Sequence, residues 1–183
     1  MSLATKIFAL AAPLILFGFV GTASGDALPY HARAMASVGI ELPMADRVLV
    51  RKSERRMYLM RGADVLRAYR IALGLNPGGA KERAGDFRTP EGSYKLTRRN
   101  ARSDFFLSIQ VSYPNDQDTR NARRNGWQPG GSIMIHGLPN DPRHMPDYYA
   151  TQDWTDGCIA VTNADMVEIW MMTSENVRID IQP

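Results

Sequence analysis

A cysteine and a histidine, each beside a glycine, are the residues of this chain best suited to chemistry. Cys158 follows Gly157 at the start of the apolar run C-I-A-V, and His136 ends the run S-I-M-I-H and precedes Gly137. A free thiol has a pKa of about 8.5, so little of it is ionised at neutral pH, and a histidine within hydrogen-bond reach can take its proton. If the two runs are neighbouring strands, both side chains meet at one sheet edge.

The glycine before the cysteine adds an electrostatic element to this pair. Gly157 permits a sharp turn and a close approach of substrate. The backbone N–H groups of Gly157 and Cys158 are predicted to point at a developing oxyanion, and such donors are worth about 3–4 kcal/mol each in comparable sites. The segment therefore predicts nucleophilic acyl chemistry.

Residue types alone leave other roles open. A free cysteine is also common as a small buried hydrophobic residue. A single cysteine rules out an intramolecular disulfide framework and a cysteine-rich metal cluster. His31 and His144 are expected to be solvated, and the Cys and His residues lack the short spacing of a zinc site. We therefore expect no metal and no cofactor.

The N-terminus has the three-part layout of a secretory signal peptide. Lys6 precedes an uncharged apolar run at 7–20, and small residues follow, with cleavage expected after Ala23 or Gly25. The run is shorter than the about 20 apolar residues of a membrane span, and an uncleaved anchor is the alternative. We expect residues 1–25 to be the signal peptide, and the rest to reside in the periplasm or cell envelope.

Composition predicts an ordinary globular domain after this segment. The 183 residues are 44% hydrophobic and 22% charged, and the formal net charge is only +3. Lys and Arg are scattered rather than clustered, so a nucleic-acid partner is not expected. The length suits one domain, and the sequence specifies no oligomeric state.

Short alternating apolar runs dominate the chain after residue 45 and predict strands. Residues 26–45 form a lead-in, and 46–183 form one domain. A long loop spans 77–92, and the prolines of 137–155 indicate a second loop without helix. Strands are expected at 47–52, 57–60, 65–73, 93–97, 104–113, 132–136, 158–161 and 177–181.

Two helices are expected among these strands. A short one runs from Asp118 as cap to Arg124, and a longer one follows Asn163 as N-cap. The longer helix is predicted to pack Met166 and Ile169, with Trp170 and Thr173, against a sheet. The fold class is therefore mainly β: a β-sandwich of mixed sheets with one packed C-terminal helix and long loops around the site.

The Cys/His segments resemble the L,D-transpeptidase catalytic domain, the YkuD-like family of bacterial cell-wall enzymes. The family pattern is His-Gly, a spacer, and then Ser/Thr-His-Gly-Cys; here it is His136-Gly137 and then Thr155-Asp156-Gly157-Cys158. The resemblance includes G-D-F-R-T-P-E-G-S-Y at 85–94 and S-I-Q-V-S-Y-P-N-D at 108–116, and it covers most of 46–181.

The resemblance implies a role for each matching residue. Cys158 would attack the carbonyl between the third residue and the D-alanine of a peptidoglycan stem tetrapeptide, release D-alanine and form a thioester. His136 would be the general base, oriented by the carbonyl of Gly137, and the N–H groups of Gly157 and Cys158 would form the oxyanion hole. An amine of a second stem, or of an envelope protein, would resolve the thioester.

Two positions depart from the family pattern. Asp156 stands where the family has histidine, and Ala160 stands where a basic or amide residue is common. Asp156 would either accept a hydrogen bond from an incoming ammonium group or only cap the turn. Its charge would also oppose ionisation of Cys158.

Several residues near these motifs are expected to bind substrate: Thr155, Asp156, Arg88, Tyr113 and Arg143. Two alternatives to a transpeptidase remain on the sequence. One is a thiol-dependent peptidoglycan hydrolase, either an L,D-carboxypeptidase or an amidase. The other is a non-catalytic wall-binding module that keeps the fold without turnover.

Overall fold

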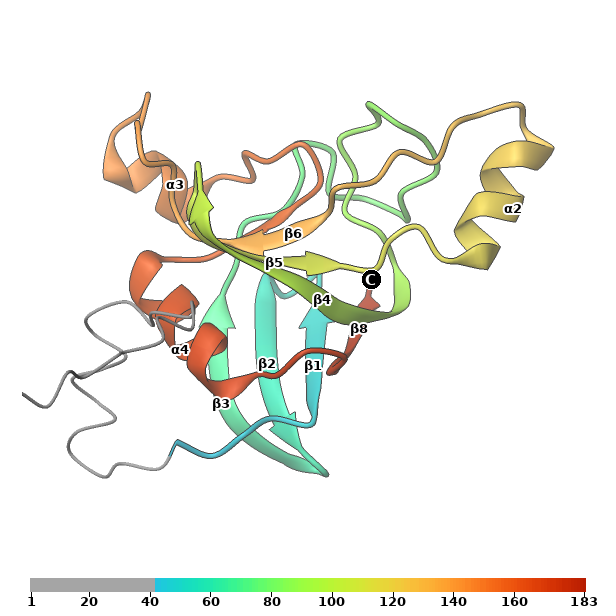
Figure 1. Ribbon diagram of the computed structural model, residues 1–183. Coiled ribbons are helices and arrows are strands. Elements are labelled where there is room, and N and C mark those ends of the chain that lie inside the picture. The colour runs from blue at the N-terminus through green and yellow to red at the C-terminus, as the bar shows by residue number, and fades with distance from the viewer. Residues whose placement is uncertain (1–41) are drawn as a thin grey trace, which may run out of the picture.

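The structure, a computed structural model, describes residues 42–183 (Figure 1). The predicted signal peptide at 1–25 and the lead-in as far as residue 41 lie outside the described residues. Within the described part, every helix is too short or too polar to cross a membrane.

Within residues 42–183, eight strands form one bent, mixed sheet in the order β3-β2-β1-β8-β4-β5-β6-β7. Their bounds are β1 (Arg47–Arg51), β2 (Arg56–Arg61), β3 (Asp64–Arg70), β4 (Gly92–Ser103), β5 (Phe106–Val111), β6 (Met134–His136), β7 (Ile159–Ala160) and β8 (Arg178–Gln182). The pairs β1–β8 and β6–β7 are parallel, and the other neighbours are antiparallel.

The long strand β4 turns this sheet into two layers. Its first residues, 92–95, pair with β8, and its remainder pairs with β5. In Figure 1, β4, β5 and β6 cross over β1, β2 and β3, and the core lies between the layers. Val48, Leu59, Ile109, Ile135 and Ile179 are completely buried there. The predicted mainly β sandwich is therefore confirmed, although β4 is longer than the strand expected at 93–97.

The two ends of the sheet also meet. Ala72, just after β3, exchanges two backbone hydrogen bonds of 2.9 Å with Ala160 of β7. Three residues on, the N–H of Leu75 donates to the carbonyl of Thr155, also at 2.9 Å. The segment that contains Cys158 is therefore fixed by β6 on one side and by residues 72–75 on the other.

Helix α4 (Asn163–Met172) packs against the sheet as predicted, with Met166 and Ile169 completely buried. Its N-cap is Thr162 rather than Asn163, because the Thr162 hydroxyl accepts the N–H of Asp165. The cap is thus one residue earlier than the sequence suggested.

Two shorter helices differ from expectation. Helix α2 (Asp116–Arg124) begins before the predicted Asp118, because Asn115 caps it and Asp118 returns a hydrogen bond as the third residue of a capping box. Helix α3 (Pro146–Thr151) lies within a segment that was predicted to be free of helix. The prediction was wrong because Pro146 occupies the first turn, where a missing N–H costs no helical hydrogen bond.

Candidate active site

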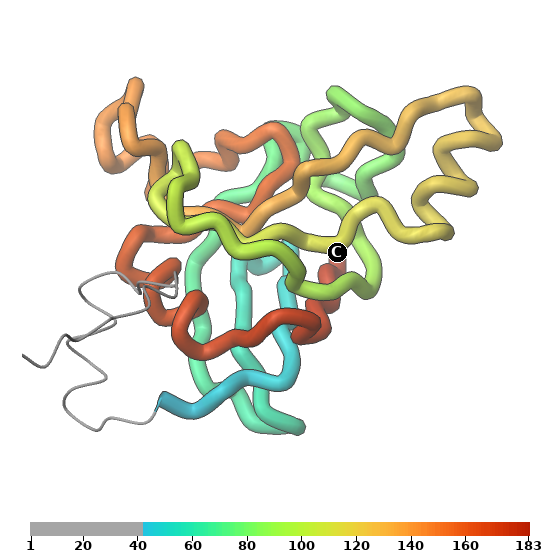
Figure 2. The backbone as a smooth tube through the Cα atoms, in the orientation of Figure 1, coloured from blue at the N-terminus to red at the C-terminus, as the bar shows by residue number. Residues whose placement is uncertain are grey.

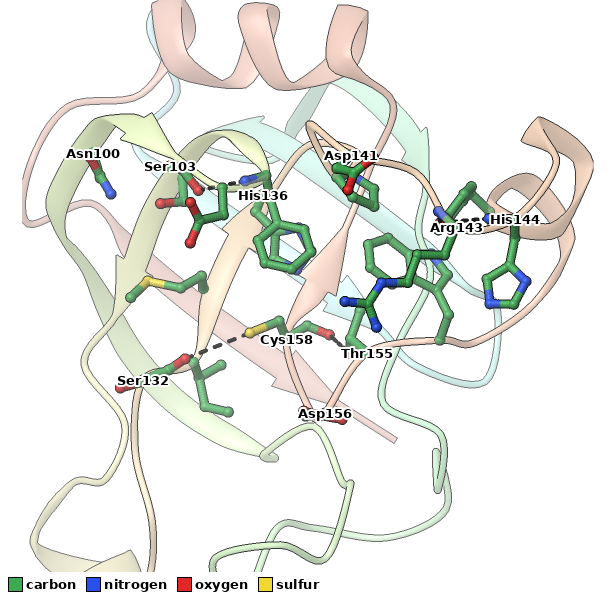
Figure 3. A pocket seen from close by; sticks show the side chains of 18 of the residues that line it. Asn100, Ser103, Ser132, His136, Asp141, Arg143, His144, Thr155, Asp156 and Cys158 are labelled. Carbon is green, nitrogen blue, oxygen red and sulfur yellow. Dashed lines mark hydrogen bonds between the residues drawn. The ribbon is translucent and has the colours of Figure 1, made fainter.

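The parallel neighbours β6 and β7 bring the predicted thiol–imidazole pair to one cavity. His136 is in register with Ala160, and Cys158 lies two residues before Ala160. Because residues two apart on a strand share a face, the side chains of His136 and Cys158 project from the same face. Both line a cavity of about 820 Å³ (Figure 3).

His136 is a buried, neutral base. Its ring is 4% exposed and packs between Phe105 and Trp154, with ring centroids 4.6 and 5.5 Å away. Nδ1 donates to the carbonyl of Gly137 at 2.7 Å. Burial lowers the pKa of His136 to about 4, against the weaker opposing effect of that carbonyl. The imidazole therefore carries no charge at neutral pH.

The side chain of Cys158 is a protonated thiol. Its Sγ lies 3.6 Å from the carbonyl oxygen of Ser132, to which the S–H donates, and it forms no hydrogen bond with His136 (Figure 3). Burial raises the pKa of the thiol, and the charge of Asp156 raises it further. The resting pair is therefore a neutral thiol beside a neutral imidazole.

Thr155 organises the turn that carries the cysteine. Its hydroxyl donates to the carbonyl of Cys158 at 2.8 Å and accepts the N–H of Gly157 at 3.1 Å. The Gly157 N–H, which the sequence predicts to face an oxyanion, is therefore used in a hydrogen bond inside the turn. The N–H of Cys158 forms no hydrogen bond with residues 42–183. Thr155, 4% exposed, has no free hydroxyl for substrate.

Gly157 is required by the backbone at this point. Its φ of +125° is a conformation that L side chains rarely adopt, and a Cβ there would lie 2.5 Å from the carbonyl oxygen of Arg88. The loop at 75–91 therefore packs directly against the cysteine turn. Figure 2 shows this loop, in green, beside the segment that leads from α2 to β6, and the Ala84 N–H donates to the Gln128 carbonyl.

A buried ion pair shapes the loop at 75–91 from within. The Asp86 carboxylate accepts Lys81 Nζ at 2.6 Å and the backbone N–H groups of Glu82, Arg83 and Arg88. The side chains of Lys81 and Asp86 are only 4% and 8% exposed. These bonds satisfy the carboxylate and lower its pKa despite burial. These interactions hold the backbone of the loop that contacts Gly157 in one conformation.

A second buried lysine closes the same loop. Lys52 Nζ donates to the carbonyls of Gly79 and Thr89 and to the Glu91 carboxylate, at 2.6, 3.0 and 2.7 Å. Because these acceptors lie near the two ends of the loop, Lys52 joins its ends to the β1–β2 turn.

Asn163 performs a similar positioning task on the histidine side. Its Oδ1 accepts the N–H of Leu138 at 2.8 Å, and a Cβ on Gly137 would lie 2.5 Å from this oxygen. The Gly137 carbonyl that orients His136 is therefore placed by the first residue of α4. Sequence reasoning assigned Asn163 to helix capping alone and missed this contact.

Asp153 anchors the chain just before the cysteine turn. Its carboxylate accepts the Arg55 guanidinium at 2.8–3.2 Å and the N–H of Leu73 at 2.9 Å. The β1–β2 turn, the end of β3 and the cysteine turn thus share one carboxylate.

Comparison with known proteins supplies the family. The chain matches the L,D-transpeptidase catalytic domain, YkuD, over residues 45–181. The chain belongs to this family. The matched region includes both His136-Gly137 and Thr155-Asp156-Gly157-Cys158, so the cavity described above lies inside the L,D-transpeptidase domain.

The match with this chain covers only part of each relative's own length. YafK of Escherichia coli (strain K12), whose name places it among L,D-transpeptidases, is 30% identical over 112 residues, which are 60% of this chain and 38% of YafK. The crystal structure of the helical cell shape determining protein Pgp2 from Campylobacter jejuni has 26% identity and a TM-score of 0.54, covering 75% of this chain and 48% of Pgp2. The structure of Bdellovibrio bacteriovorus Bd1075 has 22% identity and a TM-score of 0.51. The match covers 76% of this chain and 51% of Bd1075, and the two proteins share the fold.

The L,D-transpeptidase cavity includes some of the predicted substrate-binding residues and leaves out others. Asp156 and Arg143 line it, with Thr155 at its wall. Tyr113 does not: it is 4% exposed and donates its hydroxyl to the Pro129 carbonyl inside the fold. Arg88 does not either, because its guanidinium turns to the Ala80 carbonyl and to Glu82. Arg88 and Tyr113, which the sequence predicts to bind substrate, therefore do not line this cavity.

Sequence reasoning missed much of the cavity wall. These residues come from the end of β4, from the β4–β5 turn and from α3 with its flanking segments: Asn100, Arg102, Asp104, Phe105, Asp141, Tyr148, Tyr149 and Trp154. The aromatic pair Tyr148-Tyr149 and the neighbouring Trp154 were the available signal. Their placement depends on α3, which the prolines concealed.

Proposed function

We propose that this chain is a cell-wall peptidoglycan L,D-transpeptidase that forms a thioester on Cys158. The observation that carries the proposal is the pairing of β6 with β7, which opens the side chains of His136 and Cys158 to one cavity within the family domain. The substrate would be a peptidoglycan stem tetrapeptide, and the protein would act in the periplasm or cell envelope.

Acylation begins with proton transfer between the two neutral groups. The Cys158 side chain rotates away from the Ser132 carbonyl and gives its proton to the free ring nitrogen of His136. The thiolate attacks the carbonyl before D-alanine, and the oxyanion meets the N–H of Cys158. When the tetrahedral adduct collapses, D-alanine leaves with the proton of His136, and the thioester remains.

Transfer of the acyl group completes the cycle. An amine of a second stem peptide, or of an envelope protein, attacks the thioester carbonyl and forms an amide. The Cys158 thiolate is expelled and recovers a proton through His136. Pgp2 is described as determining helical cell shape. We extend the proposal to a role in cell-wall architecture for this chain.

The test incubates the purified protein with a defined stem tetrapeptide and follows products and intact protein by mass spectrometry. The proposal predicts an acyl adduct on Cys158, release of D-alanine and a cross-linked dimer; Cys158→Ser should form neither adduct nor dimer and should keep its fold. Shortened or cleaved peptide without a dimer would indicate a hydrolase instead. Binding without any adduct would indicate a wall-binding module.

A further inference from the structure

We infer that Asp156 is a specificity residue for the acyl acceptor: its carboxylate binds the ammonium form of an incoming amine and stabilises positive charge on the attacking nitrogen. This inference rests on the proposed thioester on Cys158. It concerns the second half of the reaction, in which an acceptor meets the acylated cysteine.

The geometry separates Asp156 from the structural role that its position suggests. A carboxylate before a Gly-Cys turn often caps that turn, but here the Thr155 hydroxyl makes the capping hydrogen bonds. The Asp156 carboxylate forms no hydrogen bond or ion pair with residues 42–183, and the side chain is exposed at the cavity wall (Figure 3). An unpaired carboxylate is therefore available to a ligand.

Chain geometry keeps the backbone of Asp156 close to that of Cys158. Asp156 and Cys158 are two residues apart, so their Cα atoms are separated by about 7 Å at most. The other charged residues of the cavity wall are Arg102 at the end of β4, Asp104 in the β4–β5 turn, and Asp141 and Arg143 before α3, with His144 beside them. All of these come from segments remote from the cysteine in sequence.

The charge acts oppositely on the two half-reactions. Asp156 raises the pKa of Cys158 and so hinders formation of the thiolate. Attack by the neutral amine, however, places positive charge on nitrogen in the tetrahedral intermediate, and a nearby carboxylate stabilises that charge more than it stabilises the neutral amine that attacks. Attack by an anionic nucleophile develops no such charge.

The protons of this step balance. The ammonium form of the acceptor loses one proton to His136 and attacks as a neutral amine, forming the C–N bond. The C–S bond then breaks, the Cys158 thiolate receives the proton from His136, and a second proton leaves the nitrogen for solvent. The products are an amide, the free thiol and one proton in solution.

The experiment isolates the second half-reaction. The acyl-enzyme is formed with a stem tetrapeptide, verified by intact mass, and mixed with methylamine or with mercaptoacetate, an anionic acceptor. Asp156→Asn should slow capture by methylamine about tenfold, the effect of losing one partly exposed charged contact. Capture by mercaptoacetate should be equal or faster. Asp156→Glu should keep the wild-type preference.

Matched variants and outcomes make the test decisive. Glu175→Gln removes the same charge outside the cavity and should leave the preference unchanged. Equal slowing of both acceptors in Asp156→Asn, or an equal loss of preference in Asp141→Asn, would overturn the inference. If the wild-type protein forms no acyl adduct, the proposed function fails; if the adduct forms and Asp156→Asn keeps its preference, the inference alone fails.

Discussion

His136 combines deep burial with the catalytic task that we propose for it, and its burial has a cost in stability that depends on pH. In the unfolded chain its imidazole titrates near 6.5, whereas burial lowers the pKa in the folded protein to about 4. Between these values the unfolded state binds a proton that the folded state does not. The contribution of His136 to the free energy of unfolding is therefore fully present above pH 6.5 and is lost progressively as the pH falls towards 4.

This decline is measurable by urea unfolding between pH 4 and pH 7. The free energy of unfolding should fall by about 1.4 kcal/mol per pH unit from His136 alone as the solution becomes more acidic. His136→Gln should flatten that slope, while His144→Gln, at an exposed position, should not. An unchanged slope in His136→Gln would contradict the neutral buried imidazole.

Cys158 offers a second prediction. It is the only cysteine of the chain, so thiol alkylation measures this side chain alone. Burial and the charge of Asp156 raise the pKa of its thiol. The rate of alkylation by iodoacetamide should therefore reach half its maximum at a pH above that of a free cysteine, and Asp156→Asn should move this midpoint to lower pH. A wild-type midpoint below neutral pH would instead indicate a preformed thiolate–imidazolium pair.

At the scale of residues, sequence reasoning found what depends on type and spacing and missed what depends on partners. The pairing of Cys158 with His136 followed from two apolar runs that end beside glycines. The Thr155 hydroxyl forms hydrogen bonds within the turn, and the Asn163 side chain contacts Gly137. The local sequence pattern predicts neither partner. Tyr113 lies outside the cavity lining, and a tyrosine near a motif carries no sign of whether it faces a cavity.

The loop at 75–91 is the element that fixes the position of the cysteine turn, and Gly157 is the point of contact. Gly157→Ala would place a methyl group against the Arg88 carbonyl at a φ reserved for glycine. We expect a loss of about 3 kcal/mol or more in stability, together with loss of acylation.

The control for this substitution is Gly62→Ala, in the β2–β3 turn. Its φ is +58° and no atom lies within 4 Å of the added methyl group, so about 1 kcal/mol should be lost. Chemical denaturation and the mass of the acyl adduct measure both effects. Normal acylation by Gly157→Ala would show that the loop does not position the turn.

The Lys81–Asp86 pair makes a separate prediction for the same loop. Asp86→Ala leaves a buried ammonium without its partner and frees three backbone N–H groups, so we expect a loss of about 3–5 kcal/mol. Glu54→Ala, which breaks an exposed pair with Arg51, should change stability little. Thermal and urea unfolding compare the two variants, and similar losses in both would refute a structural role for the buried pair.

At the scale of elements, alternation of apolar and polar residues predicted most strands because one face of each strand is buried. The extension of β4 to Ser103 escaped notice because its outer half, which includes Arg98, Arg99 and Asn100, is polar. Prolines were interpreted as excluding helix from 137–155. A proline at a helix start and one in its interior have the same sequence signal, so α3 was lost.

At the scale of the whole molecule, residues 42–183 are organised around a sheet whose two ends meet beside the cavity. Helix α3 lies outside this sheet. Stability should therefore be uneven. The amides of β5 and β6 lie in paired, buried strands, whereas α3 contains no buried residue. In native-state hydrogen exchange we expect α3 to exchange first and β5 to exchange only with global unfolding. Equal protection of α3 and β5 would contradict this ordering.

The overall architecture could be anticipated from strand count and from the resemblance of the motifs, and the family match over 45–181 agrees with it. The closure through Ala72 and Ala160 could not, because pairing between segments so distant in sequence is decided by the packing of both layers. The boundaries at 25 and 45 stay predictions.

The hydrogen bond from His136 to the Gly137 carbonyl has one more effect. A carbonyl oxygen can only accept, so Nδ1 must carry the hydrogen and Nε2 must carry the lone pair. The reactive tautomer is thereby selected by the main chain itself. No side-chain replacement can delete that acceptor, so a mutational scan seeking an acidic third member of the catalytic set should find none.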